Sequence, residues 1–376
     1  MNESKCKVST IGIILLIIGC CFIVPGCYLS WQTQDGFQYI VPAEDLETTT
    51  KGASAAIGSL GEVAVSTTIA ARKQGSTLNG VRQDMGITLY AVNDDYPALC
   101  HETLKAGRLI SPGDVQEKRQ VIVVDENTAY ALFSGGDAIG KSITIDQADW
   151  TIVGVVSRKA RYGESAEGVA FIPLSTAAEK HLKMDTLEIR VIGGSGNGSE
   201  ALLQTTLTQW RSDGTFLSLE REKYAATMPL HWAVVIAGLL LSVRMIKYVI
   251  EYAAKQLGHY RQRLQSNYAL ELFWWIAGRI LLLLLLATIA AAITIITLKL
   301  LTAPALVFTD WIPERPVSIS SYASRFWAIH RESAKAIQYT SREMSTIMLA
   351  AWLIRWGGIA ALGGCFITTK KWRNTK

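Results

Sequence analysis

The sequence predicts a membrane protein with four transmembrane α-helices and an α+β extracytoplasmic domain inserted between helices 1 and 2. Three observations support this. The 376-residue chain concentrates its apolar residues in four nearly uncharged runs, and the sequence between the first two runs is ordinary and mixed. Each run approaches or exceeds the roughly 20 residues that a helix needs to cross about 30 Å of hydrocarbon. The runs lack alternation with a period of two, which excludes transmembrane strands. The runs are 11–28, 224–243, 280–298 and 346–369.

The basic residues of the short connections predict the orientation of the four helices. Lys and Arg are frequent before the first run, between the second and third runs, and after the fourth. These segments all lie on one side, which the positive-inside rule makes cytoplasmic. The outer loop also holds basic residues, but Asp310, Glu314, Glu332 and Glu343 accompany them. We therefore expect a multi-pass protein of the cell membrane, and anchoring explains the net charge of +5 without a nucleic-acid partner. The expected organisation is cytoplasmic tail 1–10, helix 11–28, extracytoplasmic domain 29–223, helix 224–243, cytoplasmic segment 244–271, helix 272–300, extracytoplasmic loop 301–345, helix 346–369 and cytoplasmic tail 370–376.

The six cysteines do not indicate a disulfide framework or a metal site. Five of them lie in or beside the apolar runs, which leaves Cys100 alone inside the outer domain. The His and Cys spacings match no metal site, and no nucleophile–base pair stands out, so we expect no enzyme activity, cofactor or metal. Residues 17–20 resemble a lipoprotein cleavage site, but apolar sequence continues through 21–24 and favours an uncleaved helix.

The domain 29–223 alternates between strand-like and helix-like patterns. The strand-rich segment 100–175 interrupts two flanking halves and predicts a small inserted subdomain, and 193–198 reads as a glycine-rich turn. In the outer loop, 311–342 predicts an amphipathic helix that lies on the membrane or against the outer domain. Strands are expected at 62–71, 86–92, 120–124, 142–145, 151–156, 169–173, 187–192 and 215–219, and helices at 96–106, 126–133, 175–182 and 200–210.

The stretch 135–142 matches the phosphate-loop pattern GxxxxGK[ST] letter for letter. That motif works when a strand precedes it and a helix follows it, because the amides of the helix N-terminus face the phosphates. Here a predicted helix precedes the glycines and an alternating strand follows Lys141. We therefore interpret this stretch as a turn that leads into a strand, and we reject nucleotide binding.

An ordered series of segments extends over about seventy residues of the outer domain. The segments are KAGRLISPGD at 105–114, VIVVDENTA at 121–129, LF at 132–133, AIGKSITI at 138–145, WTIVGVV at 150–156 and FIPLS at 171–175. Together they resemble the extracytoplasmic core domain of MacB-type ABC transporter permeases, a class shared with FtsX-like and LolC-like proteins, and KAGRLISPGD resembles the family's "GR…D" element. The architecture of one helix, a large outer domain and three further helices is also similar.

The resemblance implies a non-catalytic permease subunit, a second permease chain as partner (homo- or heterodimer), and a separate cytoplasmic ATPase that drives it. ATP-driven motion would be transmitted to the outer domain for export or extrusion of a peptide or lipid-like substrate. The ATPase contact in this family lies between helices 2 and 3. The positions that match its pattern are Lys255, Leu257 and Gly258, with Arg261 nearby and Glu271 thirteen residues after the glycine.

The first half of that pattern departs from the family, because Ile250-Glu251-Tyr252 stands where Glu-Ile-Gly is expected. The segment 244–271 could therefore act as a positive-inside anchor that contacts lipid headgroups alone. This departure keeps a second function open, namely an FtsX-like membrane regulator or binding protein that activates an extracytoplasmic partner without transport. The predicted spans lack the paired acids or broken half-helices that an ion-coupled carrier displays.

Two arginines fall within predicted helices. Arg279 is close enough to the inner interface to extend its side chain to the headgroups. Arg355 lies deeper, between Trp352 and Trp356, and is a candidate functional charge inside the membrane. Alternatively, that helix enters the bilayer near Leu353, which would place Arg355 at the outer interface within a belt of tryptophans.

Overall fold

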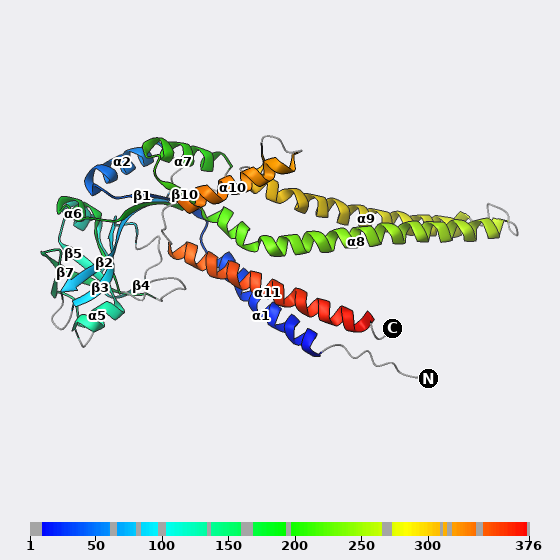
Figure 1. Ribbon diagram of the computed structural model, residues 1–376, viewed down its shortest axis with the longest axis horizontal. Coiled ribbons are helices and arrows are strands. Elements are labelled where there is room, and N and C mark those ends of the chain that lie inside the picture. Colours follow the sequence, from blue (N-terminus) through cyan, green and yellow to red (C-terminus); the bar gives the residue numbers. More distant parts are fainter. Residues whose placement is uncertain are drawn as a thin grey trace. The chain divides into compact units, whose positions relative to one another are not determined.

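The computed structural model describes residues 10–60, 66–79, 84–96, 103–133, 137–158, 168–192, 197–264, 273–308, 311–313, 318–335 and 341–373. The chain divides into two compact units. The sheet unit comprises Gly26–Lys223 and Glu332–Ala351, and the helical unit comprises the described parts of Met1–Pro25, Tyr224–Arg331 and Trp352–Lys376. Figure 1 labels many of their helices and strands.

The described strands of the sheet unit form one mixed sheet in the order β10-β1-β9-β2-β3-β8-β5-β7-β4, with β6 paired to β2 and β7. β3–β8 and β5–β7 are parallel pairs, and the other pairs are antiparallel. The strands are β1 Gly36–Pro42, β2 Ser66–Asn79, β3 Asp84–Val92, β4 Thr103–Gly107, β5 Val121–Asp125, β6 Ser142–Ile145, β7 Ala148–Ser157, β8 Gly168–Pro173, β9 Thr186–Ile192 and β10 Thr215–Ser218. The helices beside them are α2 Leu46–Ser59, α4 Pro112–Gln116, α5 Glu126–Phe133, α6 Leu174–Glu179 and α7 Asn197–Trp210.

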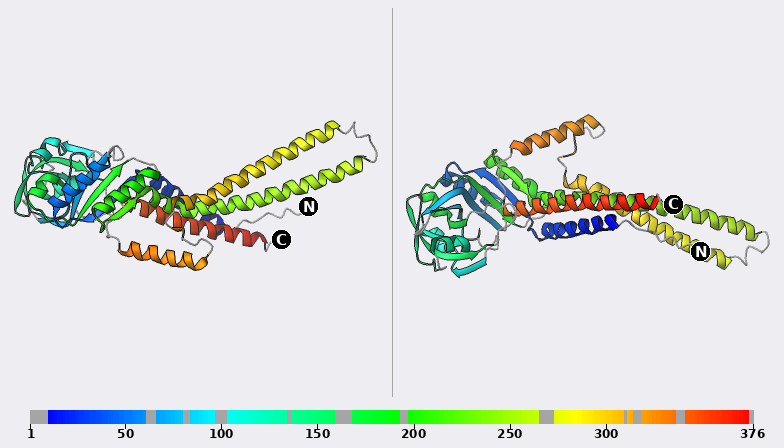
Figure 2. Two further views of the ribbon diagram at one scale, coloured as in Figure 1. Left: turned by 90° about the horizontal axis from the view of Figure 1, so that it is seen from above. Right: turned by 60° about the horizontal axis from the view of Figure 1, so that its bottom comes forward.

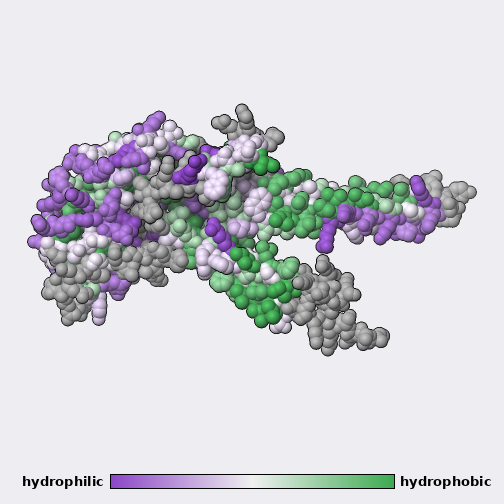
Figure 3. Space-filling view, viewed as in Figure 1, coloured by the Kyte–Doolittle hydropathy of each residue, from purple (hydrophilic) through white to green (hydrophobic). Residues whose placement is uncertain are grey.

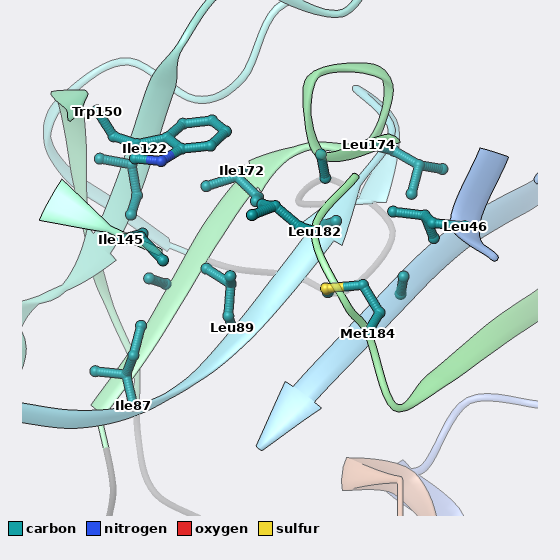
Figure 4. Close-up of a cluster of buried hydrophobic side chains, with 14 of the residues drawn as sticks. Leu46, Ile87, Leu89, Ile122, Ile145, Trp150, Ile172, Leu174, Leu182 and Met184 are labelled. Carbon is teal, nitrogen blue, oxygen red and sulfur yellow. The ribbon is translucent and has the colours of Figure 1, made fainter. Parts of the chain in front are cut away.

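Both faces of the sheet are covered, and the strand alternation decides which side chains face which layer. On one face, apolar side chains of β1, β9 and β2 pack with Leu46 and Ala53 of α2 and Leu207 of α7. The same cluster continues under the far end of the sheet, where Trp150 is fully buried (Figure 4). On the opposite face, Phe171 stacks on Tyr90 at 5.6 Å between ring centroids. This second layer also holds charged residues, which form part of the site described below.

Most of the predicted strands and helices of the outer domain are confirmed, with bounds that differ from the predicted ones by at most eight residues. The predicted helix over 96–106 is wrong for its second half, because Thr103–Gly107 is strand β4. Leu104 pairs with Val156 of β7 across the sheet edge, so tertiary pairing overrides the local helical pattern. β1, α2 and α4 were not predicted from the sequence. The strands of the predicted inserted segment lie together, yet they continue the same sheet through the β3–β8 pair. Of the glycine-rich turn predicted at 193–198, residues 193–196 lie outside the described part, and α7 already begins at Asn197.

The rejection of the phosphate-loop match is supported by the described part of that stretch, 137–142. Gly140 has φ of +80°, which makes it the turn residue. β6 begins at Ser142 directly after it, and α5 precedes the stretch. Lys141 lies 4.9 Å from the ring centroid of Phe133. A strand therefore stands where a phosphate-binding helix would have to begin.

The "GR…D" element forms a clamp on the sheet edge. Gly107 has φ of +77° and approaches the backbone of Val153 so closely that a β-carbon would collide with it. Arg108 then donates two hydrogen bonds to the fully buried carboxylate of Asp114, with Nη2 to Oδ1 at 2.9 Å. Ser111 and Asp114 also form a capping box at the start of α4. The family motif here is an element of the fold.

Replacing Asp114 by asparagine is expected to lower the unfolding free energy by about 2 kcal/mol, because hydrogen bonds to a charged group are lost. Burial raises the pKa of this carboxyl, but hydrogen bonds from Arg108 and Ser111 outweigh it and hold the pKa well below its usual range. The stabilisation is therefore complete above the unfolded pKa of about 3.9 and is lost as the pH falls below it. Thermal unfolding of the full chain in detergent at pH 7 and pH 3 measures both effects.

A matched control for this prediction is Glu117→Gln, which removes a carboxylate of an exposed ion pair with Arg119. We expect no measurable loss of stability from it, because exposed pairs contribute little. Equal melting curves for Asp114→Asn and wild type at pH 7 would contradict the role assigned to the clamp.

The helical unit holds long apolar helices. Four helices are long and apolar enough to cross a membrane, in the ranges Thr10–Gln32, Leu219–Arg263, Ala277–Pro304 and Arg342–Thr368. The apolar colour in Figure 3 lies along these helices. The four predicted spans are thereby confirmed as membrane-capable helices. Within the described residues the long helices are α1 Thr10–Gln32, α8 Leu219–Leu264, α9 Phe273–Val307, α10 Ile319–Lys335 and α11 Arg342–Arg373.

α8 and α9 lie side by side in antiparallel orientation, as both views of Figure 2 show. Near one end of this hairpin, His231 Nε2 is 2.7 Å from the carbonyl oxygen of Leu300. Further along, a β-carbon on Gly238 would lie 2.7 Å from Thr297 Oγ1, so the two backbones approach closely at this point. α8 does not end with the predicted span at residue 243 but continues to Leu264 as one helix.

α1 and α11 pack through glycines spaced seven residues apart. A β-carbon on Gly19 would lie 2.8 Å from the carbonyl oxygen of Gly357. A β-carbon on Gly364 would lie 2.7 Å from the carbonyl oxygen of Gly12. Small residues allow membrane helices to approach at this distance and to gain van der Waals contact along the backbone. The two helices therefore form a close antiparallel pair.

Candidate functional site

The candidate functional site is a polar junction at the end of the sheet where three long helices begin or end. The chain leaves α1 at Gln32 and enters β1 at Gly36, and it leaves β10 at Ser218 and enters α8 at Leu219. β10, β1 and β9 are consecutive strands of the sheet. We call the following residues of the sheet unit the junction: Thr33, Asp35, Gln38, Glu188, Arg190, Lys223 and Glu343.

The register of β1 and β9 brings the junction side chains onto one face. Arg190 is paired with Gln38 of β1 on one side and with Thr68 of β2 on the other. Residues two apart on a strand share a face, so Glu188 lies on the same side as Arg190. All four residues are at least 90% buried. A charged sequence that alternates with Leu187, Ile189 and Val191 would ordinarily indicate a solvent-exposed face, yet this face is covered.

The first turn of α11 covers this face and supplies a second carboxylate. Arg190 donates from Nη1 to Glu343 Oε1 at 3.1 Å and from Nη2 to Glu343 Oε2 at 2.8 Å. It also donates from Nη2 to Glu188 Oε1 at 3.0 Å. Gln38 Nε2 donates to Glu343 Oε2 at 3.3 Å. One guanidinium therefore joins a carboxylate of β9 to a carboxylate of α11 in a two-pronged arrangement, which fixes direction as well as distance.

The local sequence explains why Glu343 is presented to the sheet. The Ser341 hydroxyl accepts a hydrogen bond from the Met344 amide at 3.2 Å, as an N-cap residue does. This cap starts α11 at Arg342 and places Glu343 in its first turn. An acidic residue is favoured there by the helix dipole.

A second ionic contact joins the ends of α1 and α8. Lys223 Nζ lies 2.7 Å from Asp35 Oδ1 and also donates to the carbonyl oxygen of Thr33. Lys223 is in the first turns of α8, and Thr33 directly follows α1. The side chain of Lys223 is mostly buried, whereas the side chain of Asp35 is 62% exposed. The contact therefore holds two helix ends against strands β1 and β10.

The junction links strands and helix ends through the backbone and through ion pairs. Antiparallel ladders connect β10, β1 and β9. Two of the helices are joined to the strands covalently, and the third is joined by Arg190, which contacts both Glu188 and Glu343. Among the described residues no group of three metal-binding side chains occurs.

The predicted ATPase-contact residues lie on the far part of α8. Lys255, Leu257, Gly258 and Arg261 are all exposed on this helix. A β-carbon added to Gly258 would meet nothing within 4 Å. Glu271 lies outside the described residues, so its place relative to the others stays a prediction. The structure thus presents the matching half of the family pattern on an accessible helix surface.

The two arginines of the predicted spans have different surroundings. Arg279 of α9 donates a hydrogen bond from Nη1 to Gln256 Oε1 of α8, so it joins the two helices beside the predicted contact segment. Arg355 is exposed on α11 next to Trp352 and Trp356, whose ring centroids are 6.4 Å apart. The sheet unit extends to Ala351, one turn before Arg355. The position of Arg355 relative to the bilayer stays a prediction.

Comparison with known proteins gives a consistent result. Residues 22–204 match the family model for the MacB-like periplasmic core domain. The chain is 30% identical over 122 residues to the macrolide export ATP-binding/permease protein MacB of Neisseria gonorrhoeae, which covers 31% of this chain and 19% of that protein. It is 27% identical over 149 residues to the MacB protein of Chromobacterium violaceum, covering 39% of this chain and 23% of that protein. The chain thus aligns with about a fifth of the length of these relatives.

Comparison with solved structures finds the periplasmic region of MacB from Actinobacillus actinomycetemcomitans, with 19% identity and a TM-score of 0.40 over 50% of this chain and 91% of that one. The extracellular domain of the noncanonic ABC-type transporter YknZ from Gram-positive bacteria has 16% identity and a TM-score of 0.37 over 49% of this chain and all of that one. The chain contains a MacB-like periplasmic core domain, and with its four membrane-capable helices it is a multi-pass membrane protein related to the MacB-like permeases.

Proposed function

We propose that this chain is a non-catalytic permease subunit of a MacB/FtsX-like ABC complex. A separate cytoplasmic ATPase supplies the motion, a second permease chain completes the complex, and the long helices carry displacement to the sheet unit. The substrate class is a peptide or lipid-like molecule that is extruded from the outer side of the membrane. The observation that carries the proposal is the junction, where three adjacent strands are each fixed to a different membrane-capable helix.

The proposed topology follows the positive-inside rule. Both termini and the segment between α8 and α9 are cytoplasmic, and the sheet unit is outside the cell membrane. The continuous α8 supports a mechanical role, because its 46 residues, with Pro229 among them, form one helix about 70 Å long at 1.5 Å per residue. The stretch after residue 243 then extends past the bilayer and offers Lys255, Leu257 and Gly258 to a partner.

Replacing Gly258 by arginine tests the proposed ATPase contact. A β-carbon at this position would meet nothing within 4 Å, so the fold of α8 is expected to persist. We expect at least a tenfold loss of the ATPase that co-purifies with the tagged chain, corresponding to about 1.4 kcal/mol or more of lost binding. The amount of partner recovered from membranes at equal expression of the chain is the measurement.

The matched control is Gly58→Arg in α2 of the sheet unit, where an added side chain also meets nothing within 4 Å. It introduces the same residue at an open helical position away from the predicted contact, and we expect unchanged recovery. If an ATPase is recovered equally with both variants and with wild type, the assigned contact on α8 is wrong.

A second candidate function is a membrane regulator that activates an extracytoplasmic partner without transport. The departure at Ile250-Glu251-Tyr252 from the family pattern favours it. The two candidates differ in their demand for ATP. In vesicles with the recovered ATPase, a transporter consumes ATP in step with substrate release, whereas a regulator of this kind changes the activity of an outer enzyme with no substrate appearing.

A further inference from the structure

The helix α10 has an exposed apolar face that the junction and the proposed ATPase contact do not use. Ile319 is 88% exposed, Phe326 is 52% exposed and Trp327 is 61% exposed, and Tyr322 is also open. At 100° per residue, Ile319, Tyr322 and Phe326 fall on one side of the helix, with Ala323 between them and Trp327 at the margin. A soluble helix normally turns such a face toward its own core, and here it faces outward.

The opposite side of α10 is polar and basic. Ser321, Ser324, Arg325 and Arg331 lie there, and Arg331 Nε is 3.3 Å from the carbonyl oxygen of Trp327. Ser321 and Arg325 on the polar side are partly buried, whereas Ile319, Tyr322 and Phe326 on the apolar side are exposed. This combination of Phe, Trp and Tyr on one side and arginine on the other is typical of helices that lie in a membrane interface.

The chain length around α10 keeps it near the bilayer. Eleven residues separate the end of α9 at Val307 from Ile319, and six separate Lys335 from the start of α11 at Arg342. Six residues reach at most about 25 Å when fully extended. Both neighbouring helices are membrane-capable, so the headgroup layer is within reach of this segment.

We propose that α10 is an interfacial helix that lies flat in the outer headgroup layer, with Ile319, Tyr322 and Phe326 directed into the acyl boundary. Arg325 and Arg331 remain on the wet side and attract anionic phospholipids. The partner is thus the lipid surface, and α10 supports the outer ends of α9 and α11 against displacement along the membrane normal. The inference does not depend on the ATPase contact or on transport.

Spin-label accessibility tests this proposal on the full chain in nanodiscs of phosphatidylethanolamine and phosphatidylglycerol. Ala323→Cys and Phe326→Cys report on the apolar face, and Ser324→Cys and Ala328→Cys report on the opposite face, each on a background without the six native cysteines. We expect the ratio of oxygen to nickel-chelate collision rates to be several-fold higher for 323 and 326 than for 324 and 328. Only lipid immersion raises oxygen contact while it excludes the chelate.

Other patterns would overturn the proposal. High chelate contact at all four positions means that α10 lies in water, and low contact with both reagents at 323 and 326 means that protein covers this face. Photo-crosslinking through p-benzoylphenylalanine at Tyr322 and Ser324 gives a second readout that keeps all native cysteines. A lipid adduct at 322 but not at 324 supports the interfacial placement, and a protein adduct at 322 contradicts it. These results are independent of the ATPase recovery measured with Gly258→Arg.

Discussion

Replacing Glu343 by alanine is expected to lower the unfolding free energy of the sheet unit by about 1.5–3 kcal/mol, the range for lost hydrogen bonds to a charged group, because Arg190 keeps Glu188 as its second partner. The change leaves Arg190 at 5% exposure with one of its two carboxylates removed and releases the first turn of α11 from β9. We also expect the chain to lose its function in cells, because the third of the three helix attachments is gone. Thermal unfolding of the purified chain in detergent, followed by near-UV circular dichroism, measures the first effect.

The directional hydrogen bonds between Arg190 and Glu343 can be tested separately from the contribution of this buried cluster to stability. The triple variant Arg190→Met, Glu188→Leu and Glu343→Leu replaces the charges with apolar groups of similar size, which is often neutral or stabilising for a buried ion cluster. We expect its melting temperature to recover toward wild type while function stays impaired. A triple variant that regains both would show that packing alone is needed at this position.

An exposed pair provides the control for the same experiment. Glu47 and Lys51 form an ion pair across one turn of α2, and both side chains are largely exposed. Glu47→Ala is therefore expected to leave the melting curve unchanged within error. If Glu343→Ala behaves like Glu47→Ala, the buried contact does not hold α11 to the sheet.

The second large effect is expected from a bulky residue between α1 and α11. Gly19→Leu places a side chain where a single β-carbon already lies 2.8 Å from the carbonyl oxygen of Gly357, so the two helices must separate. Even Gly19→Ala is expected to cost about 1–3 kcal/mol, the usual range for overpacking. Melting temperature and monodispersity of the detergent-solubilised chain report the loss.

Two other glycines of α11 serve as matched controls. A β-carbon on Gly358 or Gly363 would meet nothing within 4 Å. Gly358→Ala and Gly363→Ala are therefore expected to leave stability unchanged or to raise it by up to about 1 kcal/mol, because alanine favours the helix over glycine. An equal effect of alanine at 19, 358 and 363 would argue against a specific α1–α11 contact.

The sequence alone determined the features that depend on local pattern. Uncharged runs as long as 11–28 and 280–298 are suited to helices in a membrane, and no distant residue is needed to recognise them. The strand at 121–125 and the helix at 126–133 likewise follow from apolar content and spacing. The resemblance to MacB-like domains can also be recognised from the sequence. The segment KAGRLISPGD contains both members of the clamp, Arg108 and Asp114, which are only six residues apart.

Only the tertiary structure decided the features that join distant segments. Residues 103–107 became a strand because β7 offers an edge to pair with, and the local pattern carries no information about that edge. Arg190 and Glu343 are 153 residues apart, so neither strand alternation nor charge balance could pair them. Glu188 and Arg190 alternate with apolar residues, which is the pattern of a solvent-exposed strand face. Both are nevertheless buried, and Arg190 binds Glu343 of α11. The physical reason is that local pattern sets backbone preference within a few residues, whereas a buried charge is stable only beside a partner that folding brings to it from a distant segment.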